Sequence, residues 1–394
     1  MTLKSILGIL FFGSLNFAGF CQQDSIAISG NLKGLEGKRV YISFSDESGK
    51  SKSFSTMGNK NQFLLKVPIQ KIPVVARLDV GINRGLSVEV DGRSIGSPAP
   101  PLSLFVFNKN IKVDGDALLV QFASVKGDAE NNYFERLNKI IRKDEVIQYQ
   151  NYRAMFLAKY QQQPLTRTEE EVQEENQVLR KKTLQKQLEF IDKNPQAFAS
   201  LFLLSRMANY FTADGYAAAF DKLDNKYKRT PIAESIKKTI EKTDVTRAGK
   251  PAILFERKDK DGNTIQLADF KGKTVLLDFW GSWCCPCRAS HPHLKELYSK
   301  YHKDGFEIIA IAYERGETVE ESKKSWLKAI EQDGINWIHI LNMEGIEKMD
   351  IVKEYKVSAF PTKILVGADG KIILRVTSSA TDDIDKTLEK IYGH

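Results

Sequence analysis

The chain has few cysteines for its length. Only four occur among its 394 residues, and three of them fall between Cys284 and Cys287. If a leader is removed near Cys21, the three clustered cysteines are all that remain, so a disulfide framework spread over the fold is excluded. Their role must be local, and C-x-x-C spacing in an exported chain indicates a redox pair or half of a metal site.

Long apolar runs are also lacking, apart from one near the start. The stretch Ile6–Phe20 follows Lys4 and is shorter than the roughly 20 residues that a membrane-spanning helix needs. With small residues up to Cys21, it predicts a signal peptide over residues 1–21 and therefore a periplasmic or otherwise extracytoplasmic protein. A lipid attached to Cys21 or an uncleaved leader would instead anchor the chain to a membrane.

Blocks of one charge sign are lacking too. The formal net charge is +8, but residues 250–394 hold 22 Lys and Arg against 23 Asp and Glu, so the surplus lies in the first 249 residues. There the basic residues alternate with acidic ones, as in NKIIRKDE, which is typical of a solvated helix face. We therefore expect no nucleic-acid partner.

The sequence pattern divides the chain into three parts, without internal repeats. Residues 24–115 hold short alternating stretches such as KRVYISFS and NQFLLKVP, which predict an all-β, sandwich-like antiparallel domain. Residues 128–243 change to a helical period and predict several packed helices. Gly249 and Pro251 are typical of a linker to a third domain over residues 250–394.

The third domain alternates strands and helices, which predicts an α/β fold. TVLLDFW and FEIIAIAY are expected to be buried strands, RASHPHLKELYSKYH a helix, and TKILVGADGKIILRV a hairpin that turns at Asp369–Gly370. A strand that runs directly into a C-x-x-C and then a helix would expose the first cysteine at a helix N-terminus.

Two segments of this domain, LLDFWGSWCCPCRASHP and SAFPTKILVGADGKII, resemble the thioredoxin superfamily. With a leader, the chain is similar to the exported, TlpA/ResA-like disulfide reductases. The resemblance covers roughly residues 250–394, and the β-rich domain has no assigned role. The residues that carry the resemblance are Trp283, Pro286, Pro292 and Phe360–Pro361–Thr362.

The resemblance implies a redox-active disulfide between Cys284 and Cys287. Unpaired N–H groups and the helix dipole would stabilise the Cys284 thiolate, which makes it the nucleophile. Cys287 would attack the mixed disulfide and release the reduced substrate. Asp278, a lone carboxylate between large apolar neighbours, would have its pKa raised by burial and could then take the proton from Cys287. A surface aspartate is the alternative.

Other residues near the motif would shape the site. Pro361 matches the cis-proline of the family, and Phe360 before it would present its backbone to an extended substrate. Trp283 would form part of the substrate rim. Cys285 and Pro286, between the two cysteines, would tune the reduction potential. Pro292 is expected inside the helix, where it would kink the axis.

Other functions of the cysteine cluster remain open. Cys284, Cys287, His291 and His293 form a C-x2-C-x3-H-x-H run that a copper or zinc metallochaperone could use, although the two histidines lie about 200° apart on a helix. A peroxiredoxin is disfavoured because no Thr-x-x-Cys is present. A ligand-binding protein with a scaffold thioredoxin module would not need an intact C-x-x-C.

The sequence therefore predicts an extracytoplasmic thiol:disulfide oxidoreductase without metal or cofactor. Pro286 and Asp278 resemble the reducing members, so the expected reaction is reduction of disulfides in exported proteins, apocytochromes among them. The expected partners are those proteins and a membrane thiol that donates electrons.

Overall fold

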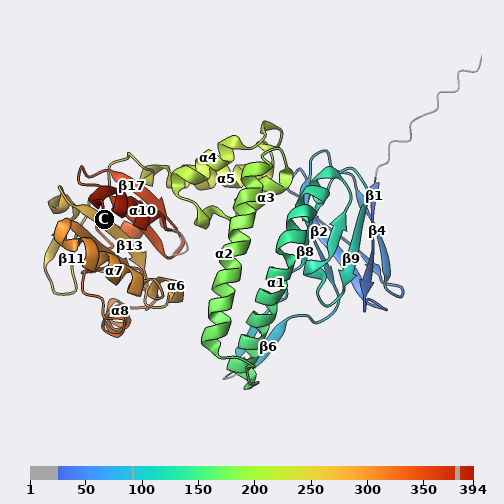
Figure 1. Ribbon diagram of the computed structural model, residues 1–394, viewed down its shortest axis with the longest axis horizontal. Helices are drawn as coiled ribbons and strands as arrows, with labels where there is room; N and C mark the ends of the chain where they lie inside the picture. The colour runs from blue at the N-terminus through green and yellow to red at the C-terminus, as the bar shows by residue number, and fades with distance from the viewer. Residues whose placement is uncertain (1–24, 91–92, 378–381) are drawn as a thin grey trace, which may run out of the picture.

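The computed structural model describes residues 25–90, 93–377 and 382–394. Figure 1 shows three parts in a row, with β-strands at one end, helices in the middle and a mixed α/β module at the other end. The predicted leader, with Cys21, lies outside the described residues. The expected fold class is confirmed, with β-sheets over residues 25–126, helices over 129–246 and a thioredoxin-like module after them.

The β-rich part is a sandwich of two four-stranded sheets. One sheet has the order β10-β9-β1-β4 and the other β3-β2-β5-β8, and β6 pairs with β7 in a separate ribbon. Alternation along β2 and β4 buries every second residue in the shared core, as expected for two-layer packing. The strands are β1 Ser25–Lys33, β2 Arg39–Ser45, β3 Ser51–Met57, β4 Gln62–Pro68, β5 Val74–Val80, β6 Leu86–Val90, β7 Arg93–Ser97, β8 Leu102–Val106, β9 Ile111–Asp116 and β10 Ser124–Lys126.

Two features of this sandwich differ from the sequence expectation. β10 continues the first sheet beyond residue 115, and β1 pairs with β9 in parallel rather than antiparallel. Alternation reports which face of a strand is buried but not its partner, so the parallel pair could not be predicted from it.

The middle part begins with a long antiparallel helical hairpin, seen in Figure 1 as α1 and α2. Asp128 caps α1 by accepting from two backbone N–H groups, and Thr168 with Glu171 forms a capping box that starts α2. The shorter α3 is almost fully buried against the hairpin and the β-sandwich. The helices are α1 Ala129–Gln161, α2 Glu169–Lys193, α3 Phe198–Arg206, α4 Ala213–Lys222 and α5 Pro231–Thr243.

The C-terminal module is built on a five-stranded sheet of order β15-β14-β13-β16-β17. β13 and β14 are buried at every position, which matches their continuous apolar sequences. The strands are β11 Glu256–Lys258, β12 Thr264–Gln266, β13 Thr274–Trp280, β14 Phe306–Ala312, β15 Ile338–Leu341, β16 Thr362–Val366 and β17 Ile372–Val376. The helices are α6 Cys285–Arg288, α7 His291–Tyr301, α8 Val319–Asp333, α9 Ile351–Glu354 and α10 Asp383–Tyr392.

The segment that joins the helices to the module is held against strand β17. Gly249 N donates to Ile372 O, and Ile372 N donates to Lys250 O, both at 2.8 Å. The buried Arg375 guanidinium donates to Thr246 Oγ1 at 2.6 Å. These bonds fix the linker to the edge of the sheet.

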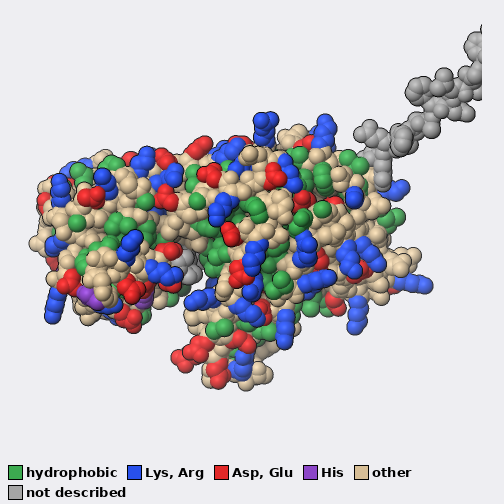
Figure 2. Space-filling model, turned by 45° about the horizontal axis from the view of Figure 1, so that its top comes forward, with side chains coloured by type: hydrophobic (Ala, Val, Ile, Leu, Met, Phe, Trp, Pro, Cys, Tyr) green, Lys and Arg blue, Asp and Glu red, His purple; other side chains and the backbone are tan. Residues whose placement is uncertain are grey.

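The surface carries charges of both signs. Figure 2 shows lysine and arginine side chains interspersed with acidic ones over the three parts. Within the described ranges, every helix is too short or too polar to cross a membrane.

Candidate active site

The cysteine pair lies where β13 ends. The buried strand leads through Gly281 into a turn, and Cys284 is the N-cap residue of the short helix α6. The backbone N–H of Cys287 points at Cys284 Sγ, 3.3 Å away. A backbone donor aimed at this sulfur favours a thiolate there once the disulfide is reduced.

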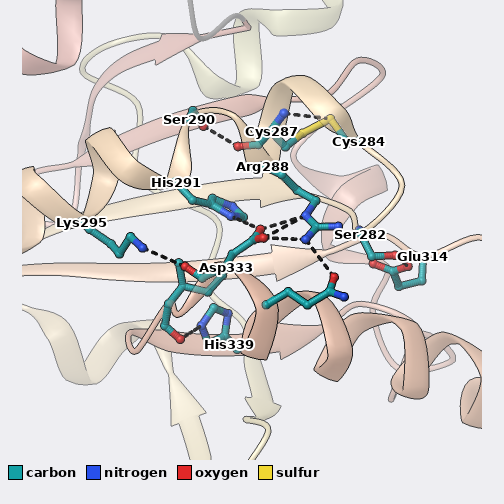
Figure 3. A network of polar contacts seen from close by, with 12 residues as sticks. Ser282, Cys284, Cys287, Arg288, Ser290, His291, Lys295, Glu314, Asp333 and His339 are labelled. Atoms are coloured by element: carbon teal, nitrogen blue, oxygen red, sulfur yellow. Dashed lines mark hydrogen bonds and ion pairs between the residues drawn. A yellow bond between two sulfur atoms is a disulfide. The ribbon is translucent and has the colours of Figure 1, made fainter. Parts of the chain in front are cut away.

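Cys284 and Cys287 are joined in a disulfide with a Cα–Cα distance of 5.3 Å (Figure 3). Their exposed fractions are 4% and 1%, whereas Cys285 between them is exposed and free. The expectation that Cys284 is exposed is wrong for this oxidised state, because the cysteine packs into the core cluster that Trp283 and Phe360 adjoin.

The helix after the cysteines is interrupted, which corrects the expected role of Pro292. α6 ends at Arg288 and α7 begins at His291, so Pro292 lies in the first turn of a new helix. A proline there lacks only an N–H that has no partner within the helix anyway. It therefore starts α7 rather than kinking a continuous helix.

A loop after β14 holds the turn in front of Cys284. Glu314 accepts hydrogen bonds from Ser282 N at 2.7 Å and from Ser282 Oγ at 2.5 Å, and Trp283 Nε1 donates to Tyr313 O at 2.8 Å. Burial raises the pKa of Glu314, and the two bonds from Ser282 oppose that rise. Gly281 leaves no room for a side chain, since a Cβ would lie 2.6 Å from Tyr313 O.

Aromatic rings border the pair. The Trp283 and Phe360 rings meet edge to face at 5.5 Å between centroids, and Tyr313 stacks on Phe360 at 5.5 Å. The Arg315 guanidinium lies 3.4 Å from the centre of the Trp283 ring. The peptide bond between Phe360 and Pro361 is cis. The structure thus brings Trp283, Phe360 and Pro361 together, and their role in substrate binding stays a prediction.

Asp278 is buried in β13, six residues before Cys284, and it has a partner. Its side chain is 1% exposed, and Lys363 Nζ, on the neighbouring strand β16, lies 3.3 Å from its Oδ1. The expectation of a lone carboxylate is therefore wrong. The surface alternative is also wrong, because β13 buries this position completely.

His291 belongs to a separate buried network, drawn in Figure 3. Its Nδ1 lies 2.7 Å from Asp333 Oδ2, and Arg288 donates to the same carboxylate. Burial lowers the pKa of His291. Burial raises the pKa of Asp333, but the hydrogen bonds from Arg288 and His291 outweigh it and lower that pKa.

The two histidines of the alternative metal site, His291 and His293, have different surroundings. His291 is buried on Asp333, whereas His293 is half exposed and lies 2.6 Å from Asp385. No group of three or more metal-ligating side chains occurs among the described residues. The two histidines therefore do not converge on the cysteines in this structure.

Sequence reasoning missed Lys363, Glu314 and Asp333. Each is distant in the chain from the residue it contacts, and no local motif marks it. The one usable signal was the unusual lysine between Thr362 and Ile364 in a buried strand, because buried lysines are almost always paired.

Comparison with known proteins agrees with this geometry. The Redoxin family model matches residues 247–390. The thiol-disulfide oxidoreductase ResA of Bacillus thuringiensis subsp. konkukian (strain 97-27) is 35% identical over 144 residues, which are 36% of this chain and 78% of that protein. ResA of Bacillus subtilis (strain 168) is 32% identical over 136 residues, 34% of this chain and 70% of that protein.

Among solved structures, the thioredoxin domain of a thiol-disulfide oxidoreductase from Bacteroides vulgatus is 34% identical, with a TM-score of 0.32. The match covers 36% of this chain and 96% of the Bacteroides chain. The family model and these ResA relatives match the C-terminal third of the chain. The chain belongs, through this third, to the ResA-type thiol-disulfide oxidoreductases of the thioredoxin-like fold.

Proposed function

We propose that this oxidoreductase works outside the cytoplasm as a reductase of disulfides in exported proteins, with cytochrome c maturation as a process that it would serve. The burial of Asp278 is the observation that supports reduction as the direction of the reaction. Asp278 is buried in β13, six residues before Cys284, and its Oδ2 accepts no hydrogen bond in the described part of the chain. Such a carboxylate has free capacity to take up the proton that the resolving thiol must lose.

The reaction follows from the positions of the two sulfurs. The Cys284 thiolate attacks a substrate disulfide, forms a mixed disulfide and expels the first substrate thiolate. The Cys287 thiol then loses its proton to Asp278 and attacks Cys284 Sγ, which expels the second substrate thiolate. The enzyme ends as the Cys284–Cys287 disulfide, and a membrane dithiol carrier supplies the two electrons that reduce it again.

The location rests on the leader over residues 1–21. N-terminal sequencing of the protein recovered from the extracytoplasmic fraction tests it. We expect a mature chain that starts near Cys21, and a full-length chain confined to the cytoplasm would contradict the proposal.

The reduction potential of the full mature chain tests the direction. We expect a value near that of thioredoxin, about −270 mV, because the pair must reduce substrates that are more oxidising. A value near that of DsbA, about −120 mV, would make the protein an oxidant and overturn the reductase proposal.

The Asp278→Asn variant tests the proton acceptor. Turnover at pH 7 should fall by roughly 100-fold, the lower end of what a general base contributes, while alkylation of reduced Cys284 keeps its rate. Equal losses in turnover and alkylation would show that Asp278 supports the first attack as well.

A further inference from the structure

A buried chain of polar contacts connects Asp278 to the turn that carries Cys287. Lys363 Nζ lies 3.3 Å from Asp278 Oδ1 and donates to Ser290 Oγ at 3.1 Å. The Ser290 hydroxyl in turn donates to Cys287 O at 2.7 Å. The side chains of Lys363 and Asp278 are 4% and 1% exposed, so water does not screen this pair.

The fold fixes both ends of this series of polar contacts. Asp278 and Lys363 are direct partners in the antiparallel ladder between β13 and β16. Ser290 follows Cys287 by three residues, and its N–H also donates to Cys287 O. Lys363 also lies two residues after Pro361, so one strand carries both the cis-proline and the lysine.

Lys363 supplies the cation that faces Asp278. On the other side of β13, the ladder partner of Asp278 is Ala310, which has no charge. His291 on α7 is close enough to interact with the carboxylate, but burial lowers the pKa of His291 and favours its neutral form. Arg288 on α6 is engaged by Asp333. The other titratable group in this chain of contacts is Cys287 itself.

A carboxyl group that already carries a proton cannot accept the proton of a thiol, and an ammonium beside a carboxyl group favours its ionised form. Lys363 places such an ammonium 3.3 Å from Asp278 Oδ1. Removing one partner of a buried ion pair leaves an uncompensated charge, which the remaining group avoids by changing its protonation state.

We propose that Lys363 is a positioning residue of the resolving step, which pairs with the Asp278 carboxyl group and, through Ser290, ties this base to the turn of Cys287. The inference rests on the proposed function, in which Asp278 takes that proton. In the step, the bond between Cys287 Sγ and Cys284 Sγ forms while the bond between Cys284 Sγ and the substrate sulfur breaks. The electron pair leaves with the substrate thiolate, and the proton of Cys287 goes to Asp278.

The test compares four full-length variants, Lys363→Met, Lys363→Arg, Asp278→Asn and the double variant Asp278→Asn/Lys363→Met. A preformed mixed disulfide between Cys284 and a thionitrobenzoate group serves as the probe. Release of thionitrobenzoate is followed by absorbance from pH 5 to pH 10 and reports the resolving step alone.

Lys363→Met should slow the release at pH 7 by roughly 10-fold to 100-fold and move the rise of the pH profile to higher pH, since the carboxyl group now ionises later. Lys363→Arg keeps the positive charge and should restore most of the rate. The double variant should be no slower than Asp278→Asn, because Lys363 can act on the resolving step only through the Asp278 carboxylate. It also contains no unpaired buried charge, so it remains interpretable if Lys363→Met is poorly folded.

A Lys363→Met profile with the wild-type midpoint would overturn the inference. So would a double variant whose slowing equals the product of the two single effects. The proposed function fails on a different readout, namely a wild-type protein whose reduced Cys284 does not attack a disulfide at all.

Discussion

Acidification should destabilise the C-terminal module through the buried His339. This residue lies in β15 with no exposed surface, and burial, with smaller effects from its neighbours, lowers its pKa from 6.5 to about 4. Because the pKa in the folded state is depressed, the unfolded chain binds more protons between these values, and stability is lost as the pH falls. The difference between the unfolded-state and folded-state pKa of His339 corresponds to ~3.4 kcal/mol in the free energy of unfolding, of which about 2 kcal/mol is lost between pH 7 and pH 5. His291 adds to the loss, since burial lowers its pKa too.

Urea unfolding followed by tryptophan fluorescence measures this loss. The four tryptophans of the chain, Trp280, Trp283, Trp326 and Trp337, all lie in this module, so the signal reports its unfolding alone. The control is His339→Gln, which cannot be protonated in this range. From pH 7 to pH 5 the oxidised wild type should lose about 2 kcal/mol more stability than His339→Gln. Parallel losses in the two proteins would refute the reasoning.

Three further predictions concern the surroundings of the cysteines. Glu314→Ala should lower the free energy of unfolding by about 1–3 kcal/mol, because the two donors of Ser282 lose their acceptor; an unchanged urea midpoint would contradict this. Trp283→Ala should raise KM for a disulfide-containing peptide by roughly 10-fold, because the aromatic rings beside the cysteine pair are lost, and should leave Cys284 alkylation near the wild-type rate. An equal fall in kcat/KM and in the alkylation rate would contradict this. Reduced protein should hold well under one equivalent of copper or zinc after dialysis, and a stoichiometric metal lost in His291→Ala would restore the metallochaperone reading.

The sequence was informative where the signal is local. Continuous apolar runs predicted β13 and β14 as buried strands. The resemblance of the segments around the C-x-x-C and Phe360–Pro361–Thr362 to the thioredoxin superfamily implied a thioredoxin-like module, which the structure and the ResA relatives confirm. Helical periodicity likewise placed helices between residues 128 and 243. In each case neighbouring residues determine the feature, so one sequence suffices.

The sequence was uninformative where strands or loops distant in the chain meet. The pair of Asp278 with Lys363 depends on the register between β13 and β16, and the bonds from Ser282 to Glu314 depend on a loop after another strand. The break before His291 also escaped prediction, because Pro292 is compatible with both a kink and a helix start. Contacts of this kind require the tertiary fold.

The division of labour between the cysteines is the central claim, and Cys287→Ala tests it directly. Without the resolving thiol, Cys284 should accumulate mixed disulfides with exported proteins. Cys285 remains, but neighbouring Cα atoms lie about 3.8 Å apart, below the 4.4–6.8 Å that a disulfide prefers and the 5.3 Å of the native pair. The adjacent thiol should therefore resolve the trap poorly.

The measurement is non-reducing electrophoresis followed by mass spectrometry of the linked peptides, with Cys284→Ala and Cys285→Ala/Cys287→Ala as controls. The account predicts long-lived mixed disulfides through Cys284 in Cys287→Ala and in the double variant, and none in Cys284→Ala. Turnover by Cys287→Ala at the wild-type rate, with trapping only in the double variant, would contradict it and identify Cys285 as the resolving thiol.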